Sequence, residues 1–158
     1  MERTLMMDYD PANCAIGAAV AIIGERSTFL VLREAFNGVR RFADMQRRTG
    51  IPRQVLSGRL ARLVEEGLLR KVPYQDSGQR IRHEYRLTSK GLDLYPVLVG
   101  LMRWGDQYAT GPGGPPVLLR HRDCGERVHV QLACEAGHIL ESARDVEPVP
   151  GPGARKIA

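Results

Sequence analysis

The spacing of apolar residues along the first third of the chain predicts a series of short helices. Asn13 is a typical capping residue for a helix that Gly24 ends. A second helix is expected over 27–36, where apolar side chains recur close to the helical period of 3.6 residues. A short helix over 42–48 follows, and the chain then turns at Gly50.

The next segment, 52–66, combines a helical pattern with a favourable start. Pro52 suits the first turn of a helix, because the N–H group that proline lacks would have no partner there. One face of this helix carries the apolar residues Leu56, Leu60, Leu63 and Val64. Strand-like segments at 68–73 and 84–87 then flank a polar, turn-rich connection, which predicts a β-hairpin with a long loop.

The rest of the chain divides at a Gly- and Pro-rich segment. A helix is expected over 90–109, and Pro96 should kink it or split it in two. The predicted organisation is a winged helix-turn-helix domain, a linker, a small β-rich appendage and a flexible tail, at 12–109, 110–116, 117–147 and 148–158 respectively. The predicted fold class is therefore mainly α with a small β-hairpin wing.

Charge is concentrated in the middle of the chain. Residues 40–90 hold 13 Lys and Arg against five Asp and Glu, a net charge of +8, whereas the whole chain carries +5. A basic excess held in one third of a chain indicates a surface that faces a polyanion. A solvated face that happens to use arginine is the alternative, and the position of the charges decides between the two.

The order of short helix, glycine turn, longer helix and hairpin favours double-stranded DNA as that polyanion. In a helix-turn-helix the second helix lies in the major groove, and Arg, Gln and Ser side chains read base edges or bind phosphates. The residues expected at the groove are Arg53, Gln54, Ser57 and Arg59. Contacts to phosphates or the minor groove are expected from Arg41, Arg47, Arg48, Arg62, Arg80 and Arg82.

The same residues carry a family resemblance. The segments RFADMQRRTGIPRQVLSGRLARLVEEGLLRKVPY and RHEYRLTSKGLDLYPVL, within 12–108, resemble the HxlR-type winged helix-turn-helix regulators, relatives of the MarR group. The resemblance implies a homodimeric DNA-binding regulator, commonly a repressor, whose N- and C-terminal helices form the dimer. It assigns 52–66 as the recognition helix and 75–83 as the wing. A protein dyad of this kind implies a pseudo-palindromic operator.

Three cysteines cannot all pair within one chain, so each has its own interpretation. Cys14 lies where the first helix begins, and a helix N-terminus favours the thiolate, the form of cysteine that oxidants attack. The resemblance also implies a redox sensor near this position, whereas a small packed core residue is the alternative. The appendage offers a Cys2His2 zinc set, but its spacing departs from a zinc ribbon and we favour no metal. That set is His121, Cys124, Cys134 and His138.

Other classes of function lack their signals. The sequence has no nucleophile–base pattern and no phosphate-binding glycine loop, so we expect no enzyme. An aromatic content of 6% argues against stacking on single-stranded nucleic acid. The longest apolar stretch, 14–24, is too short to span a bilayer, so we expect a cytoplasmic protein without membrane contact. A winged-helix module for protein–protein contact alone is the main alternative. The effector that the sequence allows for a regulator is an oxidant or a small molecule.

Overall fold

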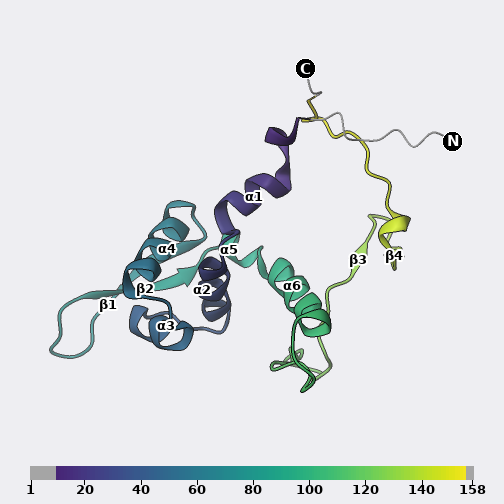
Figure 1. The fold of residues 1–158 in the computed structure, drawn as a ribbon. Coiled ribbons are helices and arrows are strands. Elements are labelled where there is room, and N and C mark those ends of the chain that lie inside the picture. Colours follow the sequence, from purple (N-terminus) through teal and green to yellow (C-terminus); the bar gives the residue numbers. More distant parts are fainter. Residues whose placement is uncertain (1–9, 156–158) are drawn as a thin grey trace. The chain divides into compact units, whose positions relative to one another are not determined.

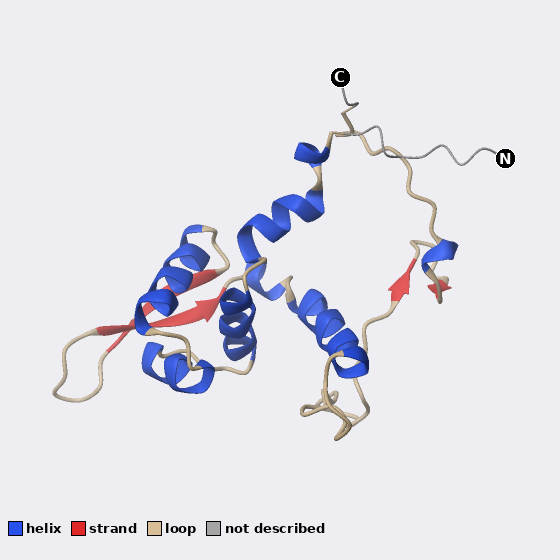
Figure 2. Cartoon of the chain, in the orientation of Figure 1, coloured by secondary structure: helices blue, strands red, loops and turns tan. Residues whose placement is uncertain are grey.

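The computed structural model describes residues 10–155, which form two compact units (Figure 1). The larger unit comprises 25–130, and the smaller combines 10–24 with 131–155. Helices dominate, and a single longer hairpin accompanies them, which confirms the predicted mainly α class with a small β wing (Figure 2). The domain bounds drawn from the sequence, with their linker and appendage, stay a prediction.

Three helices of the larger unit surround its core: α2 (Arg26–Phe36), α3 (Phe42–Thr49) and α4 (Arg53–Glu65). All three lie within one or two residues of their predicted bounds. The core side chains are almost fully buried: Val31, Leu32, Met45, Leu56, Leu60, Leu63 and Leu69. Gly50 ends α3 with a φ of +68°, a left-handed conformation that glycine adopts without the steric cost of a side chain. This residue produces the tight turn that a helix-turn-helix requires.

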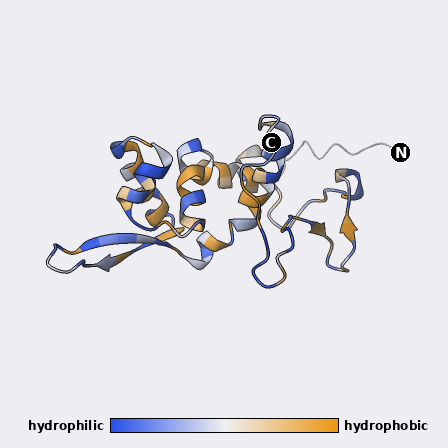
Figure 3. Cartoon of the chain, turned by 90° about the horizontal axis from the view of Figure 1, so that it is seen from below, coloured by the Kyte–Doolittle hydropathy of each residue, from blue (hydrophilic) through white to orange (hydrophobic). Residues whose placement is uncertain are grey.

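The hairpin of β1 (Leu69–Tyr74) and β2 (Arg82–Leu87) is antiparallel and extends further than the apolar pattern indicated. Its ladder reaches Tyr74 opposite Arg82, because backbone pairing continues through polar positions that a hydrophobicity pattern does not mark. The loop between the strands projects away from the helices (Figure 1), and hydrophilic colours dominate the hairpin (Figure 3). The N–H of Tyr85 donates to the carbonyl of Arg40 at 2.8 Å, which ties the hairpin to the start of α3.

The predicted helix over 90–109 is split, as the proline indicated, into α5 (Ser89–Leu92) and α6 (Tyr95–Tyr108). Proline lies in the first turn of α6, where no N–H is needed. Thr88 caps α5 by accepting from the Gly91 N–H at 3.1 Å, and its hydroxyl donates to the Gly67 carbonyl at 2.6 Å. A Cβ on Gly91 would lie 2.2 Å from the Leu68 carbonyl oxygen, so only glycine fits there.

The smaller unit contains α1 (Ala15–Ile23) and corrects one sequence-based prediction. Cys14, rather than Asn13, occupies the N-cap position and makes no side-chain cap. Asn13 belongs instead to a 3-10 turn, Pro11–Asn13, and its amide donates to the Gly153 carbonyl. The β structure expected over 117–147 amounts to two two-residue strands and an isolated bridge. These are β3 (Leu132–Ala133), β4 (Ile139–Leu140) and the pair Arg120 and Arg127, with a 3-10 turn at Ala143–Asp145.

Candidate nucleic-acid interface

The N-terminal half of α4 presents a polar face to solvent. Arg53, Gln54 and Ser57 are all exposed, and in 10–155 none of the three side chains takes part in a hydrogen bond or ion pair. The guanidinium of Arg53 lies 5.3 Å from the ring centre of Phe42, a cation–π distance that extends it over the start of α3. The opposite face of α4 is buried, so the helix is fixed while its polar groups remain available.

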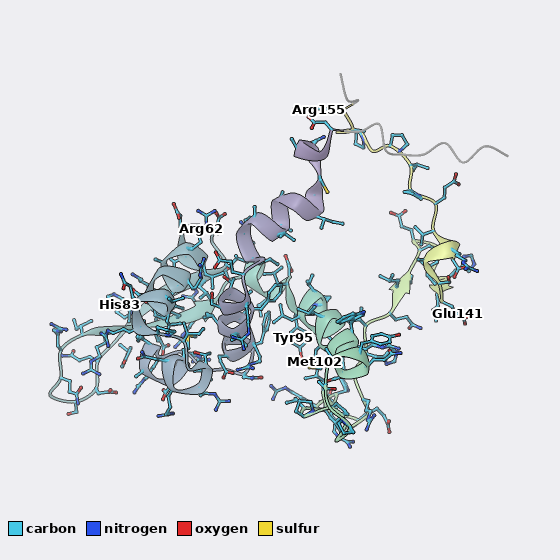
Figure 4. All side chains as sticks on the ribbon, in the orientation of Figure 1. Arg62, His83, Tyr95, Met102, Glu141 and Arg155 are labelled. Atoms are coloured by element: carbon cyan, nitrogen blue, oxygen red, sulfur yellow. The ribbon has the colours of Figure 1, made fainter. Side chains whose placement is uncertain are left out.

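The second half of α4 differs, because its arginines are already paired. Arg59 forms an ion pair with Glu25 and is only 29% exposed. Arg62, labelled in Figure 4, contacts Glu66 at 2.7 Å and Glu65 at 3.8 Å. These carboxylates neutralise much of the local charge. The two arginines are therefore less available to a polyanion than the sequence pattern implied.

The arginines of α3 are also engaged. Arg47 pairs with Asp44 one turn earlier at 2.7 Å, and Arg48 reaches across to α2, where its Nε lies 2.5 Å from Glu34. The Glu34 side chain is 3% exposed and also pairs with Arg33 at 2.7 Å. Burial by itself raises the pKa of Glu34, but the hydrogen bonds from Arg48 and Arg33 outweigh it, and the net pKa is lowered. Arg48 thus braces α3 against α2.

The wing carries two exposed arginines and one paired at its base. Arg80 lies in the loop and Arg82 begins β2, and no ion pair among the described residues involves either. Arg41 occupies the N-cap position of α3 without a side-chain cap hydrogen bond, and its side chain contacts Asp76 at 3.2 Å and lies 4.3 Å from the ring centre of Tyr74. It therefore holds the base of the wing against the helix-turn-helix.

Some surface features escaped the sequence interpretation. Val55 is 43% exposed beside Gln54, where an apolar group can contact a thymine methyl. Gly58 lies one turn after Gln54, and an added Cβ there would meet nothing within 4 Å. A hollow of about 390 Å³ is lined by Arg40, which was not among the residues expected to contact DNA, and by Arg41, Arg47 and Arg48, together with Asp44 and Glu84. The spacing of Val55 and Gly58 from the buried leucines of α4 predicts that both are exposed. The hollow could not be predicted in this way, because residues from several segments line it.

The remaining predicted site residues lie apart from this surface. Cys14 is exposed and free. His121 Nδ1 lies 3.3 Å from Cys124 Sγ in the larger unit, and His138 Nδ1 lies 3.5 Å from Cys134 Sγ in the smaller. Within 10–155, no group of three or more His, Cys, Asp or Glu residues is arranged to hold a metal ion. In the same range no single helix is long and apolar enough to cross a membrane, and only α1 and α2 taken together pass by length and composition.

Comparisons with known proteins agree on the class of molecule. The family model for HxlR-like helix-turn-helix proteins matches residues 22–111. An HTH-type transcriptional regulator of Mycobacterium tuberculosis (strain ATCC 25618 / H37Rv) is 51% identical over 139 residues, covering 88% of this chain and 87% of that protein. A solved structure described as a candidate transcription factor, PA1607, is 34% identical with a TM-score of 0.79 and covers 89% of this chain and 97% of that one.

A second solved structure, PA1374 from Pseudomonas aeruginosa, is likewise described as a candidate transcription factor. It is 31% identical with a TM-score of 0.62, covering 90% of this chain and 95% of that one. Matches this long necessarily include much of the segment after residue 111, where the family model stops. The C-terminal segment is therefore shared with relatives.

Proposed function

The chain belongs to the HxlR-like helix-turn-helix family of transcriptional regulators, which are not enzymes, and we propose from this premise that it binds DNA. The DNA is double-stranded and of a specific sequence, and α4 makes the contact. The observation that carries this proposal is the exposed, unpaired set of Arg53, Gln54 and Ser57 on the N-terminal half of α4. In a helix-turn-helix this half meets base edges, and Arg and Gln can each make two hydrogen bonds to one base. Gly58 allows the backbone of α4 to approach the groove closely.

The wing extends this contact along the duplex. Arg80 and Arg82 are placed to bind phosphates or to enter the minor groove, where they add affinity with little sequence preference. Arg41 at the start of α3 and Arg47 within α3 line one hollow, and they supply further phosphate contacts where a phosphate displaces Asp76 and Asp44. Arg59 and Arg62 contribute only to the extent that DNA displaces their carboxylate partners.

We propose a homodimer that represses by occupying a pseudo-palindromic operator in the cytoplasm. The support is the exposed apolar surface of α6, where Trp104 and Tyr108 are 59% and 65% exposed. Ile16 and Val20 of α1 are exposed as well. Exposed aromatic and aliphatic side chains along a helix are typical of an interface between copies. A dyad would set two α4 helices about one DNA turn apart.

Selection of bound sequences from a random duplex library tests the DNA proposal. A defined palindrome is the expected result. Gln54→Ala should weaken binding about tenfold or more at particular base pairs, whereas Arg80→Ala should weaken all sequences alike. Arg122→Ala, at an exposed arginine outside the segments of α4 and the wing, is the matched control and should change neither. Absence of binding to any duplex at low salt would overturn the proposal and favour a protein-docking module.

Cys14 gives the proposed regulator a route to oxidant control, because its thiol is exposed at the start of α1. We expect a thiol oxidant to change operator affinity in the wild type and to leave Cys14→Ser unaffected. Cys124→Ser is the matched control, since that thiol is also exposed. An oxidant effect that persists in Cys14→Ser would remove this part of the proposal.

A further inference from the structure

A cavity of about 270 Å³ opens between α2 and α6 in the larger unit. Its walls are mainly apolar, and Tyr95 and Met102, both labelled in Figure 4, contribute from α6. Three aromatic rings line it, those of Phe29, Phe36 and Tyr95, with 4.9 Å between the ring centres of the last two. The volume lies just below the range of about 300–1,000 Å³ that holds drug-sized ligands. A compact molecule of one or two rings therefore matches its size.

The chain itself completes the wall of this cavity. After the Gly- and Pro-rich segment the backbone returns, and Val117 and Leu119 line the cavity beside α6. Leu119 is held there because its carbonyl accepts from the Val128 N–H at 2.9 Å. The start of the C-terminal segment thus covers part of the space between α2 and α6. The space that remains fits a small molecule rather than a helix of another chain.

The cavity has a charged group at one edge. Arg33 of α2 lines it, with Asn37 one turn later, and no acidic side chain lines it. Arg33 is already bound to Glu34, at 2.9 Å from Nε and 2.7 Å from Nη2. The same carboxylate binds Arg48 of α3, so two guanidinium groups share one negative charge and the cluster keeps a net charge of +1. An anion at the cavity edge would meet uncompensated positive charge.

We propose that this cavity binds a compact aromatic carboxylate, and that the ligand's anionic group competes with Glu34 for Arg33. The aromatic walls hold the ring and the net positive cluster selects the charge. When Arg33 turns to the ligand, Glu34 is left to Arg48 alone, so occupancy changes the contact that braces α3 against α2. Because α2 also packs on α4, the ligand reaches both helices of the DNA-binding motif. This coupling rests on the proposed DNA-binding function, whereas ligand binding itself does not.

Titration calorimetry of the full chain without DNA tests the binding step. The probe is naphthalene-2-carboxylate, and its neutral amide, naphthalene-2-carboxamide, measures the contribution of charge. We expect the carboxylate to bind about fivefold more tightly than the amide, the scale of a half-exposed ion pair. Arg33→Gln should abolish that preference, and Arg26→Gln, an exposed arginine at the start of α2, should keep it. Leu119→Trp should block both probes by filling the cavity without entering the core of the winged helix.

The possible outcomes distinguish a small molecule in the cavity from a second copy of the chain, and ligand binding from DNA binding. No probe binding, or unchanged binding in Leu119→Trp, overturns the proposal. Binding that disappears as protein concentration rises would show that a second copy occupies the cavity, which also overturns it. For the coupling step, the probe should change operator affinity at least about fivefold in the wild type and not in Arg33→Gln. Probe binding that leaves operator affinity unchanged refutes the coupling, whereas failure of the probe-free protein to bind DNA refutes the proposed function alone.

Discussion

Replacing Glu34 by glutamine tests whether α2 and α3 are held together by one buried carboxylate. Glutamine keeps the shape of the side chain and removes its charge. The carboxylate of Glu34 is 3% exposed, and it binds Arg33 at 2.7 Å and Arg48 at 2.5 Å. The substitution leaves both guanidinium groups without a counter-charge. The helix-turn-helix should therefore lose stability although no apolar contact is removed.

The magnitude follows from the exposure of the arginines. Each guanidinium side chain is 51% exposed, so water screens both pairs, and each contributes up to about 1 kcal/mol. Glutamine can still accept one hydrogen bond, which retains part of this contribution. The expected loss is about 1–2 kcal/mol in the free energy of unfolding. In a unit of this size that corresponds to a fall in Tm of about 4–10 °C.

Unfolding of wild type and Glu34→Gln by urea between pH 3 and 8 measures the effect. Because the folded pKa of Glu34 is lowered, its contribution is fully present above the ordinary glutamate pKa of about 4.3. It is lost as the pH falls through the lowered folded pKa. The two proteins should therefore differ most near neutral pH and converge in acid. Glu65→Gln is the matched control, since Glu65 is 73% exposed and lies 3.8 Å from Arg62.

Two results would refute this reasoning. One is equal stability of the wild type and Glu34→Gln at pH 7, which would mean that the desolvation of the carboxylate cancels both pairs. The other is a difference that stays constant down to pH 3, which would assign the loss to altered packing instead of to charge.

Three further predictions concern two helix glycines, the proposed dimer and the proposed DNA surface. Gly91→Ala should destabilise the protein by about 1–3 kcal/mol, because the new Cβ would lie 2.2 Å from the Leu68 carbonyl oxygen. Gly58→Ala should stabilise it by about 0.5–1 kcal/mol, because the new Cβ on α4 would meet nothing within 4 Å. Thermal unfolding measures both changes. Trp104→Asp should shift the protein to monomers in sedimentation velocity and weaken operator binding, whereas Arg122→Asp should do neither. Among residues 10–155, five of the eight arginines expected to contact DNA have an acidic partner and three have none. A plot of log K against log salt should therefore have a slope of about −3 per subunit, and a slope near −7 would contradict this count.

Local sequence pattern predicted the helical elements because each depends on neighbours along the chain. Leu56, Leu60 and Leu63 define the buried face of α4 by spacing alone, and all three are buried. Gly50 and Pro96 mark a turn and a helix start through backbone restrictions that act at one residue. The extended hairpin and the role of Asn13 were not predictable in this way. Asn13 depends on a partner far away in the chain, the Gly153 carbonyl, whereas the added hairpin rungs depend on backbone pairing between polar positions such as Tyr74 and Arg82.

The candidate site was predictable as a list of residues but not as a set of available charges. Arg48 and Glu34 are 14 residues apart, and Arg41 and Asp76 are 35 apart. Neither sequence separation corresponds to a helical or strand repeat, so no pattern in the sequence predicts these ion pairs. Only the folded chain brings each carboxylate to its guanidinium. The charge count over 40–90 therefore overstates the positive charge that α3 and α4 offer to DNA.

The exposure of each carboxylate decides what its arginine can do when DNA arrives. Asp76 is 44% exposed, so a phosphate can displace it from Arg41, and the freed carboxylate then attracts a cation from solution. That uptake offsets the cation released from the DNA, so such a contact adds affinity locally but little salt dependence. Glu34 is buried, so if Arg48 departed, this carboxylate would keep only its pair with Arg33 and would have little water to replace the lost one. We therefore expect Arg48 to remain paired with Glu34 and to brace α3 against α2 when DNA binds, so that it contributes less to phosphate binding than the sequence predicts.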